Sequence, residues 1–244
     1  MNLGELHGRL QRFVDADSPE AIGRLARAHA EELGYSSFIY ALRIPTGFAE
    51  SRVVLIKGYP DSWLERYWDE RYYAIDPVID YCSDHVLPVQ WQRLVPRMSA
   101  NARRMMGEAG EFGLRSGISM PVHGPQGELG ILSFARTKDG TLSRAAVARA
   151  MVSVQLLGAY VHEAVRRVEG VVDAEPAQLS ARERDCLRWA ADGKTSWEIS
   201  KLFNISERTV NFHFDNTVAK LKASNRQHAI AKAIVTRILK PSPF

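Results

Sequence analysis

Eight side chains between residues 59 and 91 combine aromatic surface with polar atoms, and their types suit the binding of a small amphipathic molecule. They are Tyr59, Trp63, Tyr67, Trp68, Tyr72, Tyr73, Asp76 and Trp91. Tryptophan only donates a hydrogen bond, an ionised aspartate only accepts, and a tyrosine hydroxyl does either. Buried together without partners, these groups would be costly. A ligand that offers an N–H group, carbonyl oxygens and an apolar chain would satisfy them, whereas the plainer interpretation is an aromatic core.

Patterns that usually mark an enzyme are missing from the sequence. It holds no Gly-x-Ser-x-Gly element, no metal-spaced histidine cluster and no glycine-rich phosphate loop, and its seven histidines are scattered. The two cysteines, Cys82 and Cys186, lie far apart, which fits neither a disulfide framework nor a zinc site. We therefore expect no catalytic residue, no metal and no cofactor. An enzyme that acts on the same amphipathic molecule is the alternative, and turnover of that molecule would reveal it.

Positive charge is concentrated in the last quarter of the chain. The 244 residues carry a net charge of +4, with 45% hydrophobic and 25% charged residues, as in ordinary globular proteins. Residues 176–244 hold twelve basic and six acidic residues, whereas the remainder holds 20 and 22. This asymmetry favours a basic C-terminal module that meets a polyanion, with a solvated basic face as the plainer interpretation.

Nothing in the sequence indicates export or a membrane span. Polar residues interrupt the N-terminus, and the most apolar long stretch, Ala150 to Val161, is too short to cross a bilayer. We expect a soluble cytoplasmic protein without a membrane partner.

The N-terminal part alternates helices and strands in an order typical of an α+β domain. Helices are expected over Ser18 to Gly34, from Pro60, over Ala100 to Phe112, and from Ser143 to about Arg167. Strands are expected over Ser37 to Ile44, Arg52 to Lys57, Ser116 to Pro121 and Leu129 to Arg136. This order predicts an antiparallel sheet between helices, an α-β-α sandwich.

The C-terminal part has no strand signal and divides into four short helices. The second and third of these are expected to form a helix-turn-helix. Ser180, Thr195 and Ser206 are expected N-caps, and only a few residues separate the second helix from the third. In a helix-turn-helix the second helix of the motif enters the major groove of DNA. Its polar side would present arginine and lysine to phosphates and asparagine to adenine. The candidate DNA-binding residues are Lys194, Thr195, Arg208, Thr209, Asn211, Phe212, Asp215 and Lys220.

The C-terminal segments resemble the DNA-binding domain of the LuxR family. The resemblance lies in Leu179 to Glu183, Gly193 to Ile199 and Ile205 to His213, and it runs through about sixty residues without a gap. Asp215 departs from the pattern, because a base-reading arginine or a small residue often stands at that place in the family.

The N-terminal segments resemble the acyl-homoserine-lactone-binding domain of quorum-sensing LuxR regulators, most closely the LasR branch. The matching residues include Tyr59-Pro60, Asp76-Pro77 and Gly117. The resemblance implies that Trp63 donates to the lactone carbonyl, that Asp76 accepts from the ligand amide, and that Tyr59 and Ser133 donate to the acyl carbonyl. It further implies that Trp91 and Tyr67 pack the head group. The implied chain wall comprises Ile39, Ala41, Val53, Ile79, Cys82, Leu114 and Leu129.

Together these observations predict a ligand-responsive transcriptional regulator of quorum sensing. We expect residues 1–168 to bind an N-acyl-homoserine lactone and to dimerise, 169–176 to form a linker, and 177–244 to bind double-stranded DNA. The expected partners are DNA, the lactone, a second copy of the chain and RNA polymerase. A regulator of the same type that responds to a non-lactone molecule is the alternative. A two-component response regulator is disfavoured, because it needs a parallel doubly wound receiver domain.

Overall fold

The computed structural model describes residues 3–47, 49–137, 142–171 and 179–240. The chain divides into two compact units. The first comprises Met1–Arg43, Val53–Gly124 and Leu129–Asp173, and the second comprises Ala174–Phe244 with the two turns Ile44–Arg52 and Pro125–Glu128. Most of the expected linker lies outside the described residues, so its boundaries stay a prediction.

A five-stranded sheet forms the centre of the first unit. Its strands are β1 (Ser37–Pro45), β2 (Ser51–Ile56), β3 (Val89–Gln90), β4 (Ser116–His123) and β5 (Leu129–Arg136). They lie in the order β2-β1-β5-β4-β3, and the pairs β1–β5, β4–β5 and β3–β4 are antiparallel. The expected antiparallel sheet is therefore confirmed.

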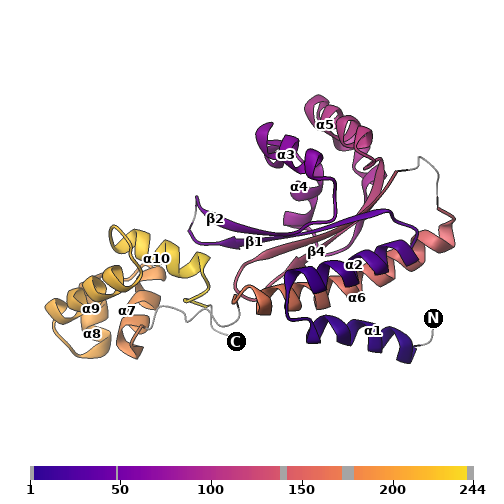
Figure 1. Ribbon diagram of the computed structural model, residues 1–244. Coiled ribbons are helices and arrows are strands. Elements are labelled where there is room, and N and C mark those ends of the chain that lie inside the picture. Colours follow the sequence, from indigo (N-terminus) through magenta and orange to yellow (C-terminus); the bar gives the residue numbers. More distant parts are fainter. Residues whose placement is uncertain (1–2, 48, 138–141, 172–178, 241–244) are drawn as a thin grey trace. The chain divides into compact units, whose positions relative to one another are not determined.

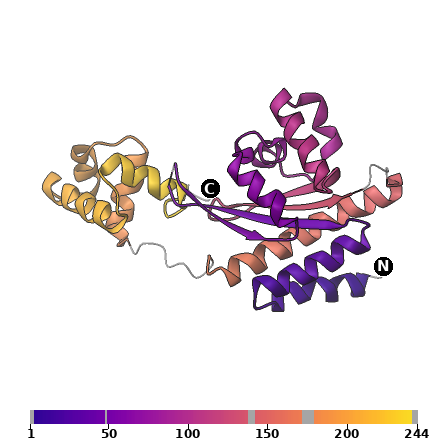
Figure 2. The same ribbon diagram turned by 45° about the horizontal axis from the view of Figure 1, so that its top comes forward.

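Helices cover both faces of the sheet, as an α-β-α sandwich requires (Figures 1 and 2). On one face lie α1 (Leu3–Asp15), α2 (Pro19–Glu32) and α6 (Arg144–Val168). On the other lie α3 (Asp61–Asp69), α4 (Pro77–Asp84) and α5 (Ala100–Glu111), with single 3-10 turns at Tyr72–Ala74, Trp91–Arg93 and Val95–Arg97.

Short polar side chains begin most of these helices. Ser18, Ser99 and Ser143 each accept a hydrogen bond from the backbone N–H three residues on, and Asp76 accepts one from Val78. Each bond satisfies one of the N–H groups that a helix leaves unpaired at its start. The helix starts expected from Ser18 and Ser143 are thus confirmed. The helix α1 and the strand β3 were not expected from the sequence.

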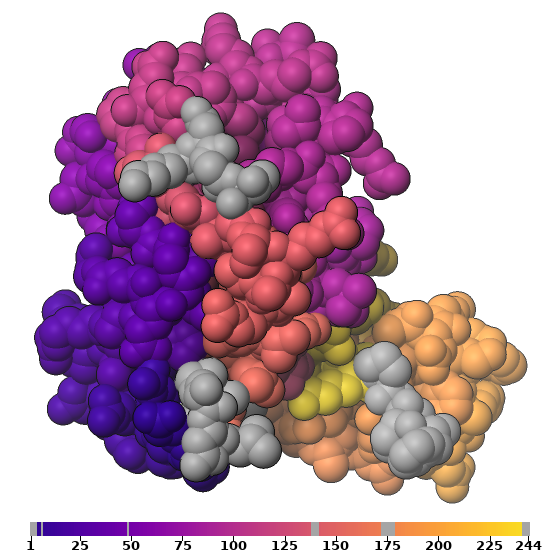
Figure 3. Space-filling view, turned by 90° about the vertical axis from the view of Figure 1, so that its right-hand side faces the viewer, coloured from indigo at the N-terminus to yellow at the C-terminus, as the bar shows by residue number. Residues whose placement is uncertain are grey.

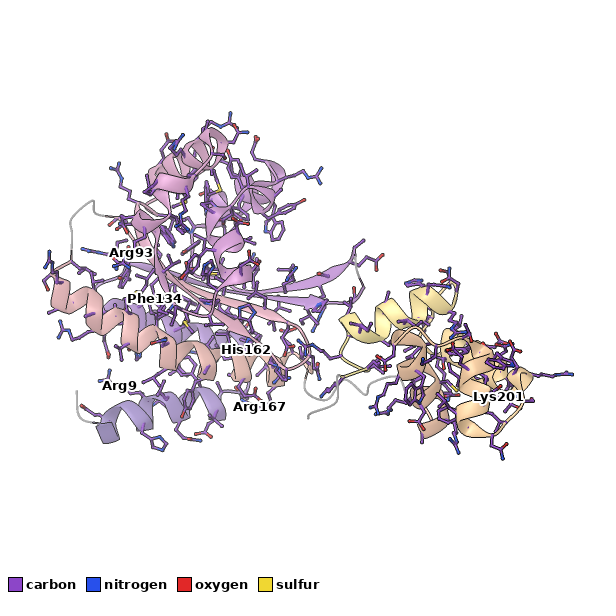
Figure 4. The ribbon with its side chains drawn as sticks, turned by 180° about the vertical axis from the view of Figure 1, so that it is seen from behind. Arg9, Arg93, Phe134, His162, Arg167 and Lys201 are labelled. Carbon is purple, nitrogen blue, oxygen red and sulfur yellow. The ribbon has the colours of Figure 1, made fainter. Side chains whose placement is uncertain are left out.

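Alternate residues of β1 face opposite layers. Phe38 contacts α2 through the guanidinium of Arg27, and the Tyr40 hydroxyl lies 2.6 Å from Nδ1 of His162 on α6. Figure 4 labels His162 and Phe134 on this side of the sheet. Because side chains alternate along a strand, Ile39 and the residues two and four positions further on face α3, α4 and α5 instead.

Helix α6 connects helices α1 and α2 to the sheet. It buries ten residues, contacts α1, α2, β4 and β5, and its Arg167 donates to the carbonyls of Val14 and Ala16. It is the one helix, among the described residues, that is long and apolar enough to cross a membrane, a test that core helices also pass. Part of α6 nevertheless reaches the surface beside α1 and α2 (Figure 3), and Val152 and Leu156 are exposed on it.

The second unit consists of four helices around a small apolar core. They are α7 (Ala181–Ala191), α8 (Ser196–Phe203), α9 (Glu207–Lys220) and α10 (Arg226–Val235). Ser180 and Thr195 begin α7 and α8 with capping boxes, and Ser206 caps α9, as expected. The last helix, α10, ends at Val235, and Ile234 is exposed on it.

Gly130 tests the packing between the sheet and α6. A Cβ placed at Gly130 would lie 2.4 Å from the Tyr40 hydroxyl oxygen and 2.6 Å from Nδ1 of His162. We expect Gly130→Ala to separate these two groups and to lower the free energy of unfolding by roughly 1–3 kcal/mol, the usual consequence of overpacking. Chemical denaturation measures the change. Gly107→Ala in α5 is the control, because a Cβ there meets nothing within 4 Å and should stabilise the helix slightly. Equal stability of the two variants would contradict this account of the interface.

Candidate functional site

A cavity of about 450 Å³ lies between the sheet and helices α3, α4 and α5. Its floor consists of side chains from β1, β2 and β5, and its walls carry aromatic rings from α3 and its neighbours. Outside the cavity lining, Glu108 connects α5 to α3 and to the turn at Tyr72, since it accepts from the Arg66 side chain at 2.8 Å and from the Tyr72 hydroxyl at 2.5 Å. The volume is that of a typical small-molecule site.

Asp76 provides the acidic group of the cavity. It is the N-cap of α4, and its two oxygens accept from the Val78 N–H and from the Tyr67 hydroxyl, each at 2.8 Å. The residue following Asp76 is a proline, whose fixed φ suits the first position of a helix. The local sequence Asp-Pro therefore fixes the carboxylate at the cavity wall.

Burial raises the pKa of the Asp76 carboxyl above its ordinary value, while the donors Val78 N–H and Tyr67 O–H act in the opposite direction. The charged form is therefore short of hydrogen-bond donors, and a further N–H from the cavity would stabilise it. Burial also raises the pKa of the hydroxyls of Tyr59 and Tyr67, with the Asp76 charge as the next cause. Both tyrosines are thus neutral donors at physiological pH.

Two donors at the same end of the cavity have no partner among the described residues. The Tyr59 hydroxyl is buried without a hydrogen bond, and none is made by the indole N–H of Trp63. The Trp63 ring itself is held between Tyr67, Tyr72 and Phe112, with ring centroids 5.5 to 5.9 Å away. Since buried donors are normally paired, these two groups are suited to acceptors on a ligand.

A chain of hydrogen bonds positions a further donor. The Trp91 indole donates to Ser119 Oγ at 2.9 Å, and Ser119 Oγ lies 2.7 Å from Ser133 Oγ. Because Ser119 already accepts from Trp91, it can donate to Ser133, which leaves the Ser133 O–H for the cavity. A Cβ at Gly117 would lie 2.7 Å from the Trp91 ring, so only glycine allows this ring its place.

The structure brings together all but one of the residues expected to contact a ligand. The polar set and the apolar wall line the cavity, with the exception of Cys82. Cys82 is fully buried within the core on α4, and burial, followed by the Asp76 charge, raises the pKa of its thiol to about 12. Cys82 packs in the same core cluster as several of the lining residues, and its expected place in the chain wall stays a prediction. The residues in their expected places are Tyr59, Trp63, Tyr67, Asp76, Trp91, Ser133, Ile39, Ala41, Val53, Ile79, Leu114 and Leu129.

Several lining residues were not expected. Those on strands follow from alternation, since Arg43 continues the series of Ile39 and Ala41, and Ile131 lies between Leu129 and Ser133. Those on helices depend on tertiary packing and had no signal of their own; they are Leu64, Met105, Met106 and Ala109.

The helix-turn-helix of the second unit consists of α8 and α9. Asn204, with φ of 52°, ends α8 in the left-handed conformation that the turn needs. On α9, Arg208, Phe212 and Asp215 are exposed, and Thr209 is half-buried beside the N-cap. On α8, Trp197 and Lys201 are exposed, and Figure 4 labels Lys201. These side chains are free to meet a DNA groove.

Some of the expected DNA contacts are engaged within the domain. Asn211 Oδ1 accepts from the Ser196 hydroxyl, which in turn accepts from Arg226. Lys220 donates to both oxygens of the buried Glu183, at 3.0 and 2.7 Å, so it links α9 to α7.

The start of α8 is likewise already bonded. The Thr195 N–H donates to Glu198, and Lys194 lies 3.6 Å from the same carboxylate. A phosphate contact at Thr195 would therefore have to displace the Glu198 side chain.

Comparison with known proteins matches both units. Residues 18–165 match the autoinducer binding domain, and residues 177–233 match the luxR family of bacterial regulatory proteins. The transcriptional activator protein AhyR of Aeromonas hydrophila is 36% identical over 251 residues, which covers 99% of this chain and 95% of AhyR. The transcriptional activator protein LuxR of Aliivibrio fischeri is 33% identical over 203 residues, which covers 82% and 80%. The structure of SdiA, an Escherichia coli protein, in complex with octanoyl-rac-glycerol has a TM-score of 0.82 at 28% identity, and the match covers 98% of this chain and 97% of that one.

The raised pKa of Asp76 makes stability depend on pH in a defined direction. A carboxyl whose folded-state pKa is raised contributes stability below its unfolded pKa, about 3.9, and that contribution is lost as the pH rises through the folded value. We expect the neutral variant Asp76→Asn to lack this loss, so its stability relative to the wild type should increase as the pH is raised from about 4. Unfolding free energies across this range, without ligand, measure the difference. Asp80→Asn is the control, since Asp80 is exposed on the same helix. A difference that does not vary with pH would contradict the burial of the Asp76 charge.

Proposed function

The chain belongs to the luxR family of bacterial regulatory proteins, and on this premise we propose that it binds an N-acyl-homoserine lactone in its N-terminal domain and, as a homodimer, an inverted-repeat promoter site. Members of this family are autoinducer-binding and DNA-binding transcriptional regulators, not enzymes. We assign ligand binding to residues 1–168, the linker to 169–176 and DNA binding to 177–244. A cytoplasmic location and contact with RNA polymerase are part of the same proposal.

The ligand proposal rests on one observation: the groups at one end of the cavity need both hydrogen-bond donors and hydrogen-bond acceptors from a ligand. Asp76 needs a donor, whereas Trp63 and Tyr59 need acceptors. An N-acyl-homoserine lactone has an amide N–H between two carbonyl oxygens. We assign the N–H to Asp76, the lactone carbonyl to Trp63, and the acyl carbonyl to Tyr59 and Ser133. Tyr67 and Trp91 would pack against the ring, and the acyl chain would follow the apolar side chains of the sheet.

A second candidate is a non-lactone amphiphile. SdiA, which shares this fold, is known in complex with octanoyl-rac-glycerol. A glycerol ester offers a carbonyl and hydroxyl groups to the same polar end, and a hydroxyl can donate to Asp76 in place of an amide N–H. Direct competition between lactones and monoacylglycerols therefore distinguishes the two ligand classes.

The DNA proposal rests on the exposed side chains of α9 and on the family match. Arg208 would contact phosphate and Phe212 would contact the apolar edge of a base. Asp215 would accept from a cytosine amino group. Asn211 would reach adenine while keeping its bond to Ser196, because an amide oxygen accepts two hydrogen bonds. Lys194, Thr195 and Thr209 would contact phosphates, with Lys220 acting mainly through Glu183.

Dimerisation is proposed through the exposed stripe of α6. Ala148, Val152, Leu156 and Ala159 are exposed at intervals of four, four and three residues, so they share one side of the helix. An exposed apolar stripe on a helix of this length is typical of an interface. A two-fold pair would place two recognition helices about one DNA turn apart, roughly 34 Å, so the site would be an inverted repeat.

Asp76→Asn tests the role of the carboxylate in lactone binding. We expect the affinity for N-octanoyl-homoserine lactone to fall roughly ten- to a hundredfold, because a hydrogen bond to a charged acceptor contributes about 1.5–3 kcal/mol. Octanoylglycerol, whose hydroxyl can donate to the same carboxylate, is measured in parallel. Titration calorimetry of both ligands against the folded variant and the wild type measures the two ratios. The exposed-site variant Asp80→Asn should bind both ligands as the wild type does. Unchanged lactone affinity in a folded Asp76→Asn protein would contradict the proposed role.

Val152→Asp tests the dimer. A buried, unpaired charge in an apolar interface is strongly unfavourable, so the variant should be monomeric in sedimentation while keeping its ligand affinity. It should also bind a full inverted repeat no better than a single half-site. Ala28→Asp, which adds the same charge at an exposed position of α2, should stay dimeric. A wild-type protein that is monomeric both with and without DNA would contradict the proposal.

A further inference from the structure

One wall residue of the ligand cavity carries a positive charge. Along β1 the residues Ile39, Ala41 and Arg43 all line the cavity, and their partners on β5 are Ser133, Ile131 and Leu129 in that order. The floor of the cavity thus consists of three cross-strand pairs. The first pair contains Ser133, whose hydroxyl belongs to the polar end of the cavity, and the last pair contains Arg43.

Arg43 lies at the end of the cavity floor opposite to the head-group residues. Ser133 and Leu129 are four positions apart along β5, and at about 3.3–3.4 Å per residue they are roughly 13 Å apart. Each strand residue contributes three backbone bonds to this distance. An extended alkyl chain beside the strand would therefore need on the order of twelve bonds to cover the same distance. The tail of a long-chain ligand, not its head, would therefore meet Arg43. The arginine side chain itself can shorten this distance by folding inward.

The guanidinium of Arg43 has no hydrogen bond, ion pair or aromatic contact among the described residues. Asp76, at the opposite end, is the only acidic residue among the described residues that line the cavity. Arg43 is exposed, so its charge remains hydrated at the cavity's edge while its stem covers apolar surface. The cavity consequently has an acceptor at one end, a free cation at the other, and apolar side chains between them.

From this arrangement, and resting on the function proposed above, we propose that the ligand is an acyl amide whose chain ends in a carboxylate, which pairs with Arg43. A guanidinium binds a carboxylate through two parallel hydrogen bonds, so the pair would fix the end of the chain as well as attract it. Asp76 would repel the same carboxylate, which allows only one direction of binding. A purely aliphatic chain would leave Arg43 without a partner. Arg43 is thus assigned as the residue that determines specificity for the chain end.

Two matched probes and two variants test this inference. The probes are N-decanoyl-homoserine lactone and the lactone with the same ten-carbon chain ended by a carboxylate. The variants of the full-length protein are Arg43→Met, which keeps an unbranched apolar stem, and Arg24→Met, which removes an exposed arginine of α2 on the other face of the sheet. Dissociation constants for both probes are measured by calorimetry or competition.

We expect wild type and Arg24→Met to bind the carboxylate-ended lactone at least as tightly as the plain one. In Arg43→Met its affinity should fall about tenfold, a modest value because the pair is partly exposed, while affinity for the plain lactone is kept or improved. The wild-type preference should also shrink as salt is added, since the charges are screened.

Three results would overturn the inference. If wild type binds the plain lactone but rejects the carboxylate-ended one, Arg43 serves only as a hydrated edge of the cavity. If Arg43→Met changes the affinity for both probes equally, its stem matters and its charge does not. If wild type binds neither probe, both the proposed function and this inference fail. The first two results would overturn this inference alone and leave the proposed function intact.

Discussion

Enclosing the Asp76 carboxylate among aromatic and apolar side chains is the constraint on which the site depends. A buried charge is unfavourable unless donors surround it, and the chain provides them from Val78 and Ile79 in the first turn of α4 and from Tyr67. Burial still raises the pKa of the carboxyl, so a further donor would stabilise its charged form. A bound amide would supply that donor, which links ligand binding to folding. At a hundredfold excess over its Kd, a ligand that binds only the folded state stabilises it by about 2.7 kcal/mol.

The two faces of the sheet lie in different environments: one packs against α6 and the other lines the cavity. On the side of α6, Tyr40 and His162 approach so closely that position 130 must be glycine. On the cavity side, Gly117 makes room for the Trp91 ring, which then orders Ser119 and Ser133. Because consecutive residues of a strand face opposite layers, one side can be packed tightly while the other keeps an open, polar-ended cavity.

Much of this arrangement could be predicted from local chemistry. Serine before a helical pattern identified the start of α6, and alternation identified Ile39 and Ala41 as one face of a strand. The sequence could not identify what depends on packing between distant segments. Cys82 matches an apolar wall residue in type, and only the packing of α4 shows that it is buried within the core cluster. Lys220 has the charge expected of a phosphate contact, yet Glu183, far away in the sequence, pairs with it.

The central claim is that this cavity selects an acyl amide through Asp76, and the most direct test is to identify what the protein retains. The full-length chain would be produced in the presence of an equimolar mixture of N-acyl-homoserine lactones and monoacylglycerols of the same chain lengths. Its organic extract after purification would then be analysed by mass spectrometry. We predict one lactone per chain, with the esters depleted relative to the mixture. An extract dominated by monoacylglycerol, or one without any amphiphile from a well-folded protein, would contradict the claim.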